Sequence, residues 1–70
     1  MAEIRAPITG SVVHVHVGVG DVVEEGTVVA VIESMKLEIP IETEVAGAIV
    51  QVHVEPGAAV AEDDVLFTVG

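Results

Sequence analysis

The sequence predicts an all-β domain in which one strand-turn-strand unit occurs twice. Seventeen valines, six isoleucines and four threonines make more than a third of the 70 residues β-branched. Such side chains fit a pleated, half-buried surface better than a helix. Apolar and polar residues also alternate over several short stretches, and no segment has apolar residues at helical spacing. These observations favour two small sheets packed around one core.

The repeat becomes visible when the sequence is shifted by 37 positions, which lays residues 10–32 over residues 47–69. Nine of the 23 aligned positions are then identical, and several of these are glycines. Two similar units in so short a chain are expected to close on each other around a pseudo-two-fold axis. The identical pairs are Gly10/Gly47, Val13/Val50, Val15/Val52, His16/His53, Val17/Val54, Gly20/Gly57, Val23/Val60, Glu25/Glu62 and Val28/Val65.

Individual strands follow from alternation and from the turn residues between them. Val13, Val15 and Val17 are predicted to face the core while His14 and His16 face solvent. Val50, Val52 and Val54 repeat this pattern, and glycine-rich or acidic segments separate the strands as turns. Strands are expected near residues 3–6, 10–17, 27–34, 37–43, 47–54 and 64–69, with short ones near 21–23 and 58–60.

Length and composition limit the function classes. Residues 1–70 are expected to form one domain, a monomer in isolation, with no room for a separate catalytic domain. The chain has no cysteine, which suits a reducing cytoplasm. Its longest unbroken apolar run, Val28–Ile32, is far shorter than a membrane helix, and no signal peptide is recognisable.

The charge is strongly acidic, with twelve Asp and Glu residues against Arg5 and Lys36 and a net charge of −10. Such a surface repels phosphate backbones and anionic lipids, so neither nucleic acid nor membrane is an expected partner. No metal site is expected either, because His16 and His53 occupy equivalent positions in the repeat and should lie far apart.

Lys36 is the only lysine and lies between the two repeats. The strands around it are expected to form a hairpin with Met35-Lys36 as the two turn residues, Ser34 opposite Leu37, and Glu33 opposite Glu38. Met-Lys is a poor turn sequence, because both central residues of such a turn need positive φ and Asn-Gly is preferred. Two facing glutamates also repel each other mildly. A locally unfavourable choice at an exposed tip indicates function.

The chemistry of this lysine suits a carrier rather than a catalyst. A solvated lysine amine is protonated at neutral pH and is therefore a weak nucleophile. A tethered group at an exposed tip can instead visit two active sites, since tethering raises its effective concentration there. We therefore expect a non-catalytic protein that is activated by a partner enzyme.

The segment Glu33-Ser34-Met35-Lys36-Leu37-Glu38 resembles the attachment motif of biotinyl domains, usually written Glu-Ala-Met-Lys-Met. The paired valine repeats resemble the biotinyl/lipoyl attachment domain along the whole chain, and residues 6–10 are similar to the Ala-Pro-Met-Pro-Gly segment of many such domains. Ser34 and Leu37 depart from the motif, as do Ile8 and Thr9 from the earlier segment. The connection between Val17 and Asp21 is too short for the protruding "thumb" of some carriers, so the chain is most similar to a small thumbless biotin carboxyl carrier protein.

The resemblance implies a flattened barrel-sandwich of two four-stranded antiparallel sheets, with Lys36 at a hairpin tip opposite the termini. It implies that biotin protein ligase attaches biotin to Lys36, and that the biotin carries a carboxyl group from biotin carboxylase to carboxyltransferase. Recognition by the ligase would involve Glu33, Ser34, Met35, Leu37 and Glu38.

Two alternatives to the biotin carrier stay open. A lipoyl carrier would bear lipoate on the same lysine, but lipoyl domains typically place Asp before the lysine and Ala after it, where this chain has Met35 and Leu37. An unmodified structural or interaction module, such as the lipoyl-like domain of a membrane-fusion adaptor, would carry a helical hairpin between the halves. No segment here has helical spacing.

Overall fold

The computed structural model describes all residues from 1 to 70, and its regular elements are strands. The structure contains no helix that is long and apolar enough to cross a bilayer. The predicted strands differ from the observed ones by one or two residues at their ends. The strands are β1 (Ala2–Arg5), β2 (Gly10–Val15), β3 (Val22–Val23), β4 (Val28–Ser34), β5 (Leu37–Glu42), β6 (Gly47–Val52), β7 (Ala59–Val60) and β8 (Val65–Val69).

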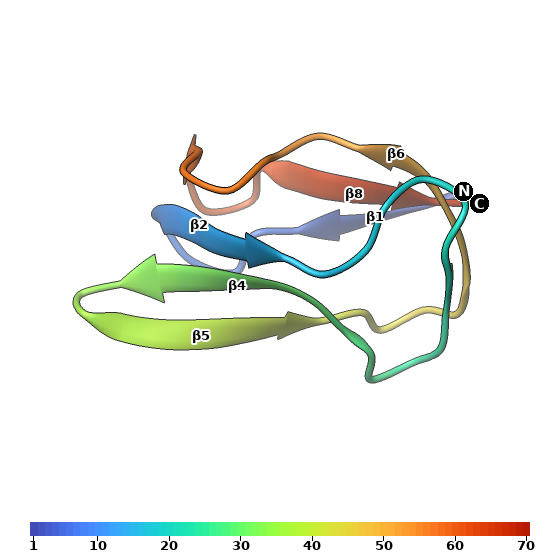
Figure 1. Cartoon of the computed structure of the whole chain (residues 1–70), viewed down its shortest axis with the longest axis horizontal. Coiled ribbons are helices and arrows are strands. Elements are labelled where there is room, and N and C mark those ends of the chain that lie inside the picture. The colour runs from blue at the N-terminus through green and yellow to red at the C-terminus, as the bar shows by residue number, and fades with distance from the viewer.

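The strands form two four-stranded antiparallel sheets, as the sequence predicted. One sheet has the order β1-β8-β6-β3 and the other the order β5-β4-β2-β7. The two sheets lie face to face as a flattened barrel, with the β4–β5 hairpin projecting at one end and both chain termini at the other (Figure 1). The molecule is elongated, measuring 31 × 19 × 17 Å.

The predicted pseudo-two-fold relation is confirmed by the sheet orders. A shift of 37 residues turns the order β1-β8-β6-β3 into β5-β4-β2-β7, strand for strand. Loop hydrogen bonds repeat as well. The Gly20 amide donates to the Ile49 carbonyl at 2.8 Å, and the equivalent Gly57 amide donates to the Val12 carbonyl at 2.8 Å. The two halves of the chain therefore share their backbone design as well as their sequence.

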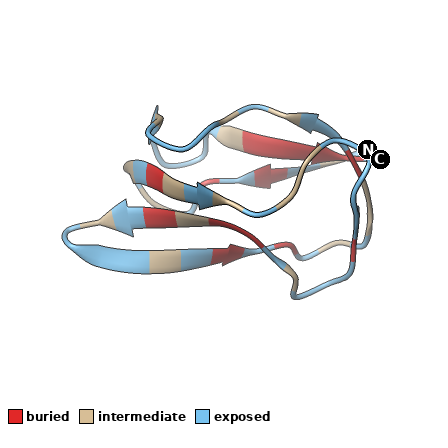
Figure 2. Ribbon diagram, viewed as in Figure 1, coloured by how far each residue is buried: buried red, intermediate tan, exposed pale blue.

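A single apolar core fills the space between the sheets. Most buried residues lie on the inner faces of the strands, while the turns are largely exposed (Figure 2). Phe67, the only aromatic residue besides the histidines, is fully buried in this core. The core members are Ile4, Ala6, Val12, Val23, Val29, Ala30, Ile32, Ile41, Ile49, Val60, Leu66, Phe67 and Val69.

The prediction that Val13 and Val50 face the core is wrong. Val12 and Ile49 are the core residues, with 2% and 1% exposure, whereas Val50 is 44% exposed. The pairing of β2 with β4 skips a residue between Val12 and His14, and the pairing of β6 with β8 skips one between Ile49 and Gln51. Such a bulge leaves one residue unpaired and shifts the alternation by one position.

Beyond each bulge the predicted faces are correct. Val15 and Val17 pack against the core, as do Val52 and Val54, while His14 and His16 are exposed. The strand alternation therefore holds on one side of the extra residue only.

A second pair of bulges lets the core take two adjacent residues from one strand. Val29 is the extra residue of β4 opposite β5, and Leu66 is the extra residue of β8 opposite β1. These residues are again 37 apart, and each is fully buried next to a buried neighbour, Ala30 or Phe67. The duplicated unit thus repeats its irregularities along with its strands.

Gly10 and Gly47 are each the first residue of a strand, β2 and β6, as the expected strand ranges indicated. A Cβ on Gly10 would lie 2.4 Å from the Glu33 carbonyl oxygen, and one on Gly47 would lie 2.5 Å from the Gly70 carbonyl oxygen. Glycine is therefore required by close approach of a neighbouring backbone. At Gly10 this approach holds β2 against β4, the strand that leads to Lys36.

Candidate modification site

The β4–β5 hairpin ends in the predicted two-residue turn. Ser34 pairs with Leu37 across it. Met35 and Lys36 have φ angles of 52° and 67°, so both central residues lie in the left-handed region without being glycine. This is the conformation of a type I′ turn, whose twist matches the two strands. The fold holds the backbone of Lys36 in a strained conformation at an exposed tip.

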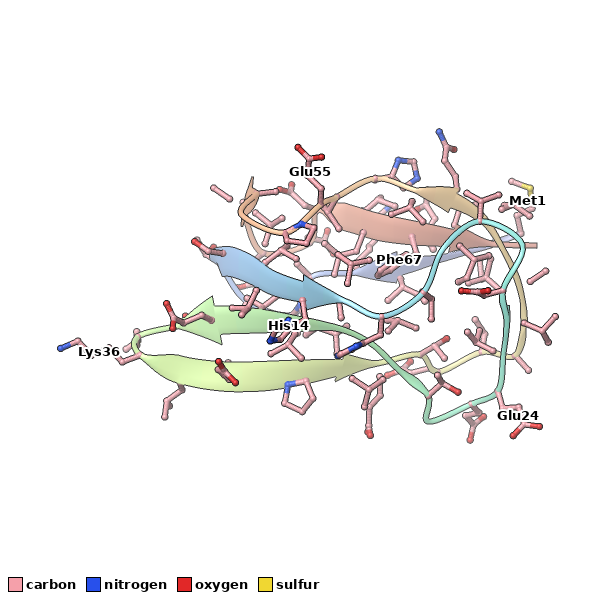
Figure 3. The ribbon with its side chains drawn as sticks, in the orientation of Figure 1. Met1, His14, Glu24, Lys36, Glu55 and Phe67 are labelled. Atoms are coloured by element: carbon pink, nitrogen blue, oxygen red, sulfur yellow. The ribbon has the colours of Figure 1, made fainter.

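Lys36 lies at the end of the molecule that is farthest from the chain termini, and its side chain extends away from the barrel (Figure 3). The residue is exposed, and neither of the two ion pairs in the chain involves it, since both are made by Arg5. The position at a hairpin tip opposite the termini agrees with the expectation from sequence. The amine of Lys36 is thus exposed to solvent at the turn between the paired strands β4 and β5.

The residues beside Lys36 are also exposed. Met35 is 85% exposed and Leu37 is 66% exposed, so neither packs over the end of the barrel. Glu33 and Glu38 are exposed and face each other in the pairing of β4 with β5, while Ser34 is half-buried. The core gains nothing from an exposed methionine and leucine here. Their apolar side chains are available to a partner surface.

The tip has no cavity of its own. One cavity of about 350 Å³ lies between β1 and β5 and includes Pro7 and Pro40 in its lining, and the other lies beside His53 and Ala58. No residue from 33 to 38 lines either one. Lys36 thus lies on a convex, exposed part of the molecule, away from both cavities.

The histidines lie on the two sheets separately. His14 and His16 stack with ring centroids 5.8 Å apart, while His53 Nε2 is 2.9 Å from the Thr68 hydroxyl. No three side chains of the kinds that bind metal ions lie together.

Comparison with known proteins agrees with this geometry. The family model described as "Biotin-requiring enzyme", of the biotin/lipoyl family, matches residues 2–69. The chain belongs to the biotin/lipoyl family. This biotin/lipoyl domain is 52% identical over 42 residues to the biotinylated protein TB7.3 of Mycobacterium tuberculosis. It is 47% identical over 38 residues to the biotin/lipoyl attachment protein of Bacillus subtilis.

These matches cover part of each relative. The segment aligned with TB7.3 spans 59% of this biotin/lipoyl domain and 59% of TB7.3. The segment aligned with the Bacillus protein spans 54% of this domain and 52% of that protein.

Solved structures share the fold over nearly the full length of the biotin/lipoyl domain. A single-chain, multi-domain long-chain acyl-CoA carboxylase superposes with a TM-score of 0.87 and 32% identity, and urea carboxylase of Kluyveromyces lactis with a TM-score of 0.91 and 26% identity. They cover 94% and 99% of this chain, which corresponds to 6% of each carboxylase. The same fold thus occurs as a small segment of large carboxylases.

Proposed function

We propose that the protein is a biotin carboxyl carrier whose biotin is attached to Lys36. The observation that carries this proposal is the position of the sole lysine, at an exposed hairpin tip, within the segment Glu33–Glu38 of a biotin/lipoyl family chain. The carboxylase neighbours and the biotinylated relatives support it.

The residues present fit covalent attachment of biotin. An amide bond needs a primary amine that an enzyme can reach and deprotonate, and Lys36 offers one without an ion pair to break. Once its proton has been removed by the ligase, Nζ of Lys36 forms the amide with a biotin carboxyl group activated by ATP, and the activating group leaves. The domain supplies position, because the paired strands β4 and β5 fix where Nζ can be found.

When bound, biotin supplies a ring that accepts and releases a carboxyl group. The part played by this chain is to carry that ring between biotin carboxylase and carboxyltransferase. The flexible lysine side chain on a rigid tip keeps the ring at high effective concentration near both enzymes. In this proposal the protein catalyses no step itself and works in the cytoplasm, where its cysteine-free sequence suits reducing conditions.

The proposal assigns recognition by the ligase to the residues beside Lys36. Met35 and Leu37 present apolar side chains on either side of the amine, while Glu33, Ser34 and Glu38 present polar groups along the two strands. Met35 and Leu37 also stand where lipoyl domains typically have Asp and Ala. These residues therefore favour biotin over lipoate.

Intact mass spectrometry tests the attachment. We expect the chain, incubated with biotin protein ligase, biotin and ATP, to gain one biotinyl group, and the Lys36→Arg variant to gain none. The arginine keeps the charge and length of the side chain, so it is the matched control. A parallel reaction with a lipoyl ligase and lipoate gives a different mass increment and ranks the two cofactors. Absence of labelling in both reactions would support an unmodified module instead.

A second experiment tests the carrier role. The biotinylated protein is supplied with biotin carboxylase, ATP and labelled bicarbonate. We expect label on the protein in excess of the Lys36→Arg control. Equal label on both proteins would contradict the carboxyl-carrier function even if the attachment of biotin were correct.

A further inference from the structure

The outer faces of the two sheets differ, although the fold makes them equivalent. On the sheet β1-β8-β6 a cross-strand row consists of Glu3, Thr68 and Gln51, which are paired in register. The equivalent row on β5-β4-β2, 37 residues away at each position, consists of Pro40, Val31 and His14. We call these the polar row and the apolar row. Because the strand pairing is the same in both, the difference lies in the residues themselves.

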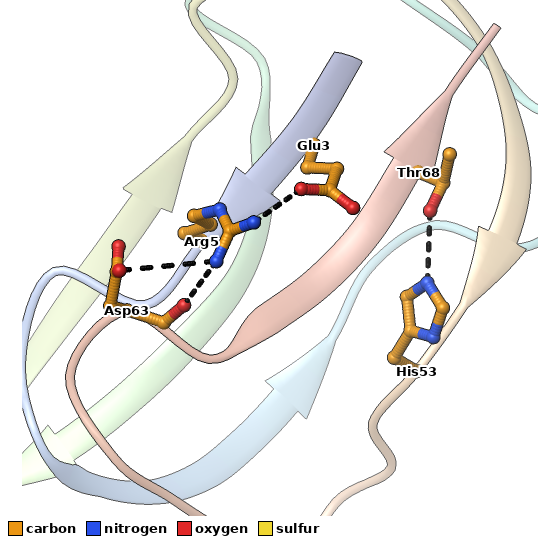
Figure 4. A network of polar contacts seen from close by, with 5 residues as sticks. All are labelled: Glu3, Arg5, His53, Asp63 and Thr68. Atoms are coloured by element: carbon orange, nitrogen blue, oxygen red, sulfur yellow. Dashed lines mark hydrogen bonds and ion pairs between the residues drawn. The ribbon is translucent and has the colours of Figure 1, made fainter. Parts of the chain in front are cut away.

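Two of the three members of the polar row, Glu3 and Thr68, have side-chain partners within the chain (Figure 4). The Glu3 carboxylate forms an ion pair with Arg5, and the Thr68 hydroxyl forms a hydrogen bond with His53 Nε2 at 2.9 Å. Arg5 also donates to the Asp63 carbonyl oxygen at 2.9 Å. Glu3 and Thr68 therefore have little to gain from a second protein, because their polar groups already have partners.

The apolar row lacks such partners. On the other sheet, His53 forms a hydrogen bond with the Thr68 hydroxyl. The position equivalent to Thr68 is Val31, which has no hydroxyl, so the equivalent histidine, His16, cannot form this bond. The ring of His16 stacks on that of His14 instead. Neither ring makes a hydrogen bond within the chain, and His14 and Pro40 are both exposed. Proline also removes a backbone donor from the edge strand β5. The result is a strip of weak polarity across three strands of an otherwise acidic protein.

Two members of the apolar row, Val31 and Pro40, lie on the strands of the hairpin that carries Lys36, and His14 lies on the neighbouring strand β2. Pro40 is four residues from Lys36 along β5, which corresponds to about 14 Å. A standard protein interface covers about 800 Å² on each partner, or roughly 30 Å across, so a single interface is large enough to include both the tip and the row. Between them lie the facing carboxylates of Glu33 and Glu38, and Glu42 lies on the far side along β5. No cation of the chain pairs with these three glutamates.

We propose that the apolar row, His14, Val31 and Pro40, is a docking surface for the biotin ligase that modifies Lys36. The matching ligase surface is apolar at its centre, with lysine or arginine side chains placed to meet Glu33, Glu38 and Glu42. This proposal rests on the function proposed above. The ligase is the partner that must come closest, because it receives the bare lysine side chain, whereas later enzymes receive a side chain lengthened by biotin.

The pseudo-symmetry supplies the test variants. His14→Gln/Val31→Thr/Pro40→Glu converts the apolar row into the polar row, with residues that the same backbone already holds on the other sheet. Gln51→His/Thr68→Val is the matched control on the opposite face. Initial rates of biotin incorporation are measured against carrier concentration with a biotin protein ligase, biotin and ATP, after denaturant unfolding has shown that each variant is folded.

We expect the triple variant to lose about tenfold or more in kcat/KM, mainly through a higher KM, and the control to react like the unaltered chain. Addition of ligase without biotin should also broaden or shift the amide resonances of β2 and β5 more than those of β6 and β8. His14→Gln alone serves if the triple variant does not fold, and it should raise KM in the same direction.

Unchanged kinetics of the triple variant, or an equal loss in the control, would overturn the docking surface and leave the proposed function intact. Absence of any labelling in the unaltered chain would overturn the proposed function, and the docking surface with it.

Discussion

Gly26 and Asp63 occupy equivalent positions in the two halves of the chain, and both have positive φ, 91° and 77°. Each amide also makes the same hydrogen bond, to the Thr43 carbonyl at 2.8 Å for Gly26 and to the Ala6 carbonyl at 2.7 Å for Asp63. The turn thus needs a left-handed residue in both halves, and only one half has glycine there.

This pair gives a reciprocal stability prediction. Asp63→Gly should stabilise the protein by up to about 1 kcal/mol, because glycine adopts the left-handed conformation without a Cβ penalty. Gly26→Asp should destabilise it by a similar amount, and by strain alone, since nothing lies within 4 Å of a Cβ at that position. Urea midpoints of both variants check this. A gain in stability from Gly26→Asp would show that turn strain does not control this position.

The second prediction concerns the strained tip. Met35→Asn/Lys36→Gly places the favoured type I′ residues at φ angles of 52° and 67° and should raise the free energy of unfolding by about 1–2 kcal/mol. The same variant has no amine to modify. Chemical denaturation measures the gain, and a loss of stability would mean that Met35 and Lys36 make stabilising contacts at the tip.

The third prediction separates the position of the lysine from its presence. Exchanging residues 35 and 36, as Met35→Lys/Lys36→Met, keeps composition and places the amine one residue earlier on the same turn. We expect biotin incorporation to fall sharply, because the side chain then leaves the tip in a different direction from the one that the ligase receives. Labelling at the rate of the unaltered chain would show that the ligase reads sequence composition rather than geometry.

The fourth prediction tests the bulges. Val12→Ala should cost about 1–3 kcal/mol through lost apolar burial and a cavity, whereas Val13→Ala, at the neighbouring extra residue, should cost less. Ile49→Ala and Val50→Ala should show the same contrast in the other half. Denaturant midpoints for the four variants provide the measurement. A larger loss of stability from Val13→Ala than from Val12→Ala would show that Val13, and not Val12, faces the core.

The sequence predicted the regular part of the fold and failed where the strands are irregular. Pairing across the Met35-Lys36 turn followed from local residue spacing, so the register of Ser34 with Leu37 could be predicted. The bulges of β2 and β6 could not, because each falls in an apolar pair, Val12-Val13 or Ile49-Val50, and alternation does not tell which member faces the core. That choice depends on the partner strand, which is distant in sequence.

The sequence predicted the lysine at the centre of the candidate site but not the apolar row beside it. Lys36 could be identified as the candidate residue because it is the only lysine and lies between the two repeats. The apolar row was missed, although the predicted register already placed Val31 opposite Pro40. His14 belongs to another strand, and its pairing with Val31 passes through a bulge that the sequence does not reveal.

The placement of the chain ends determines how this domain can be joined to other polypeptides. Strands β1 and β8 run side by side, and their free ends lie at the opposite end of a 31 Å long molecule from the Met35-Lys36 turn. Residues added before Met1 or after Gly70 therefore extend away from the space that an enzyme needs around the amine. A linker on either side therefore begins at the same end of the molecule, and its distance from Lys36 is set by the length of the barrel.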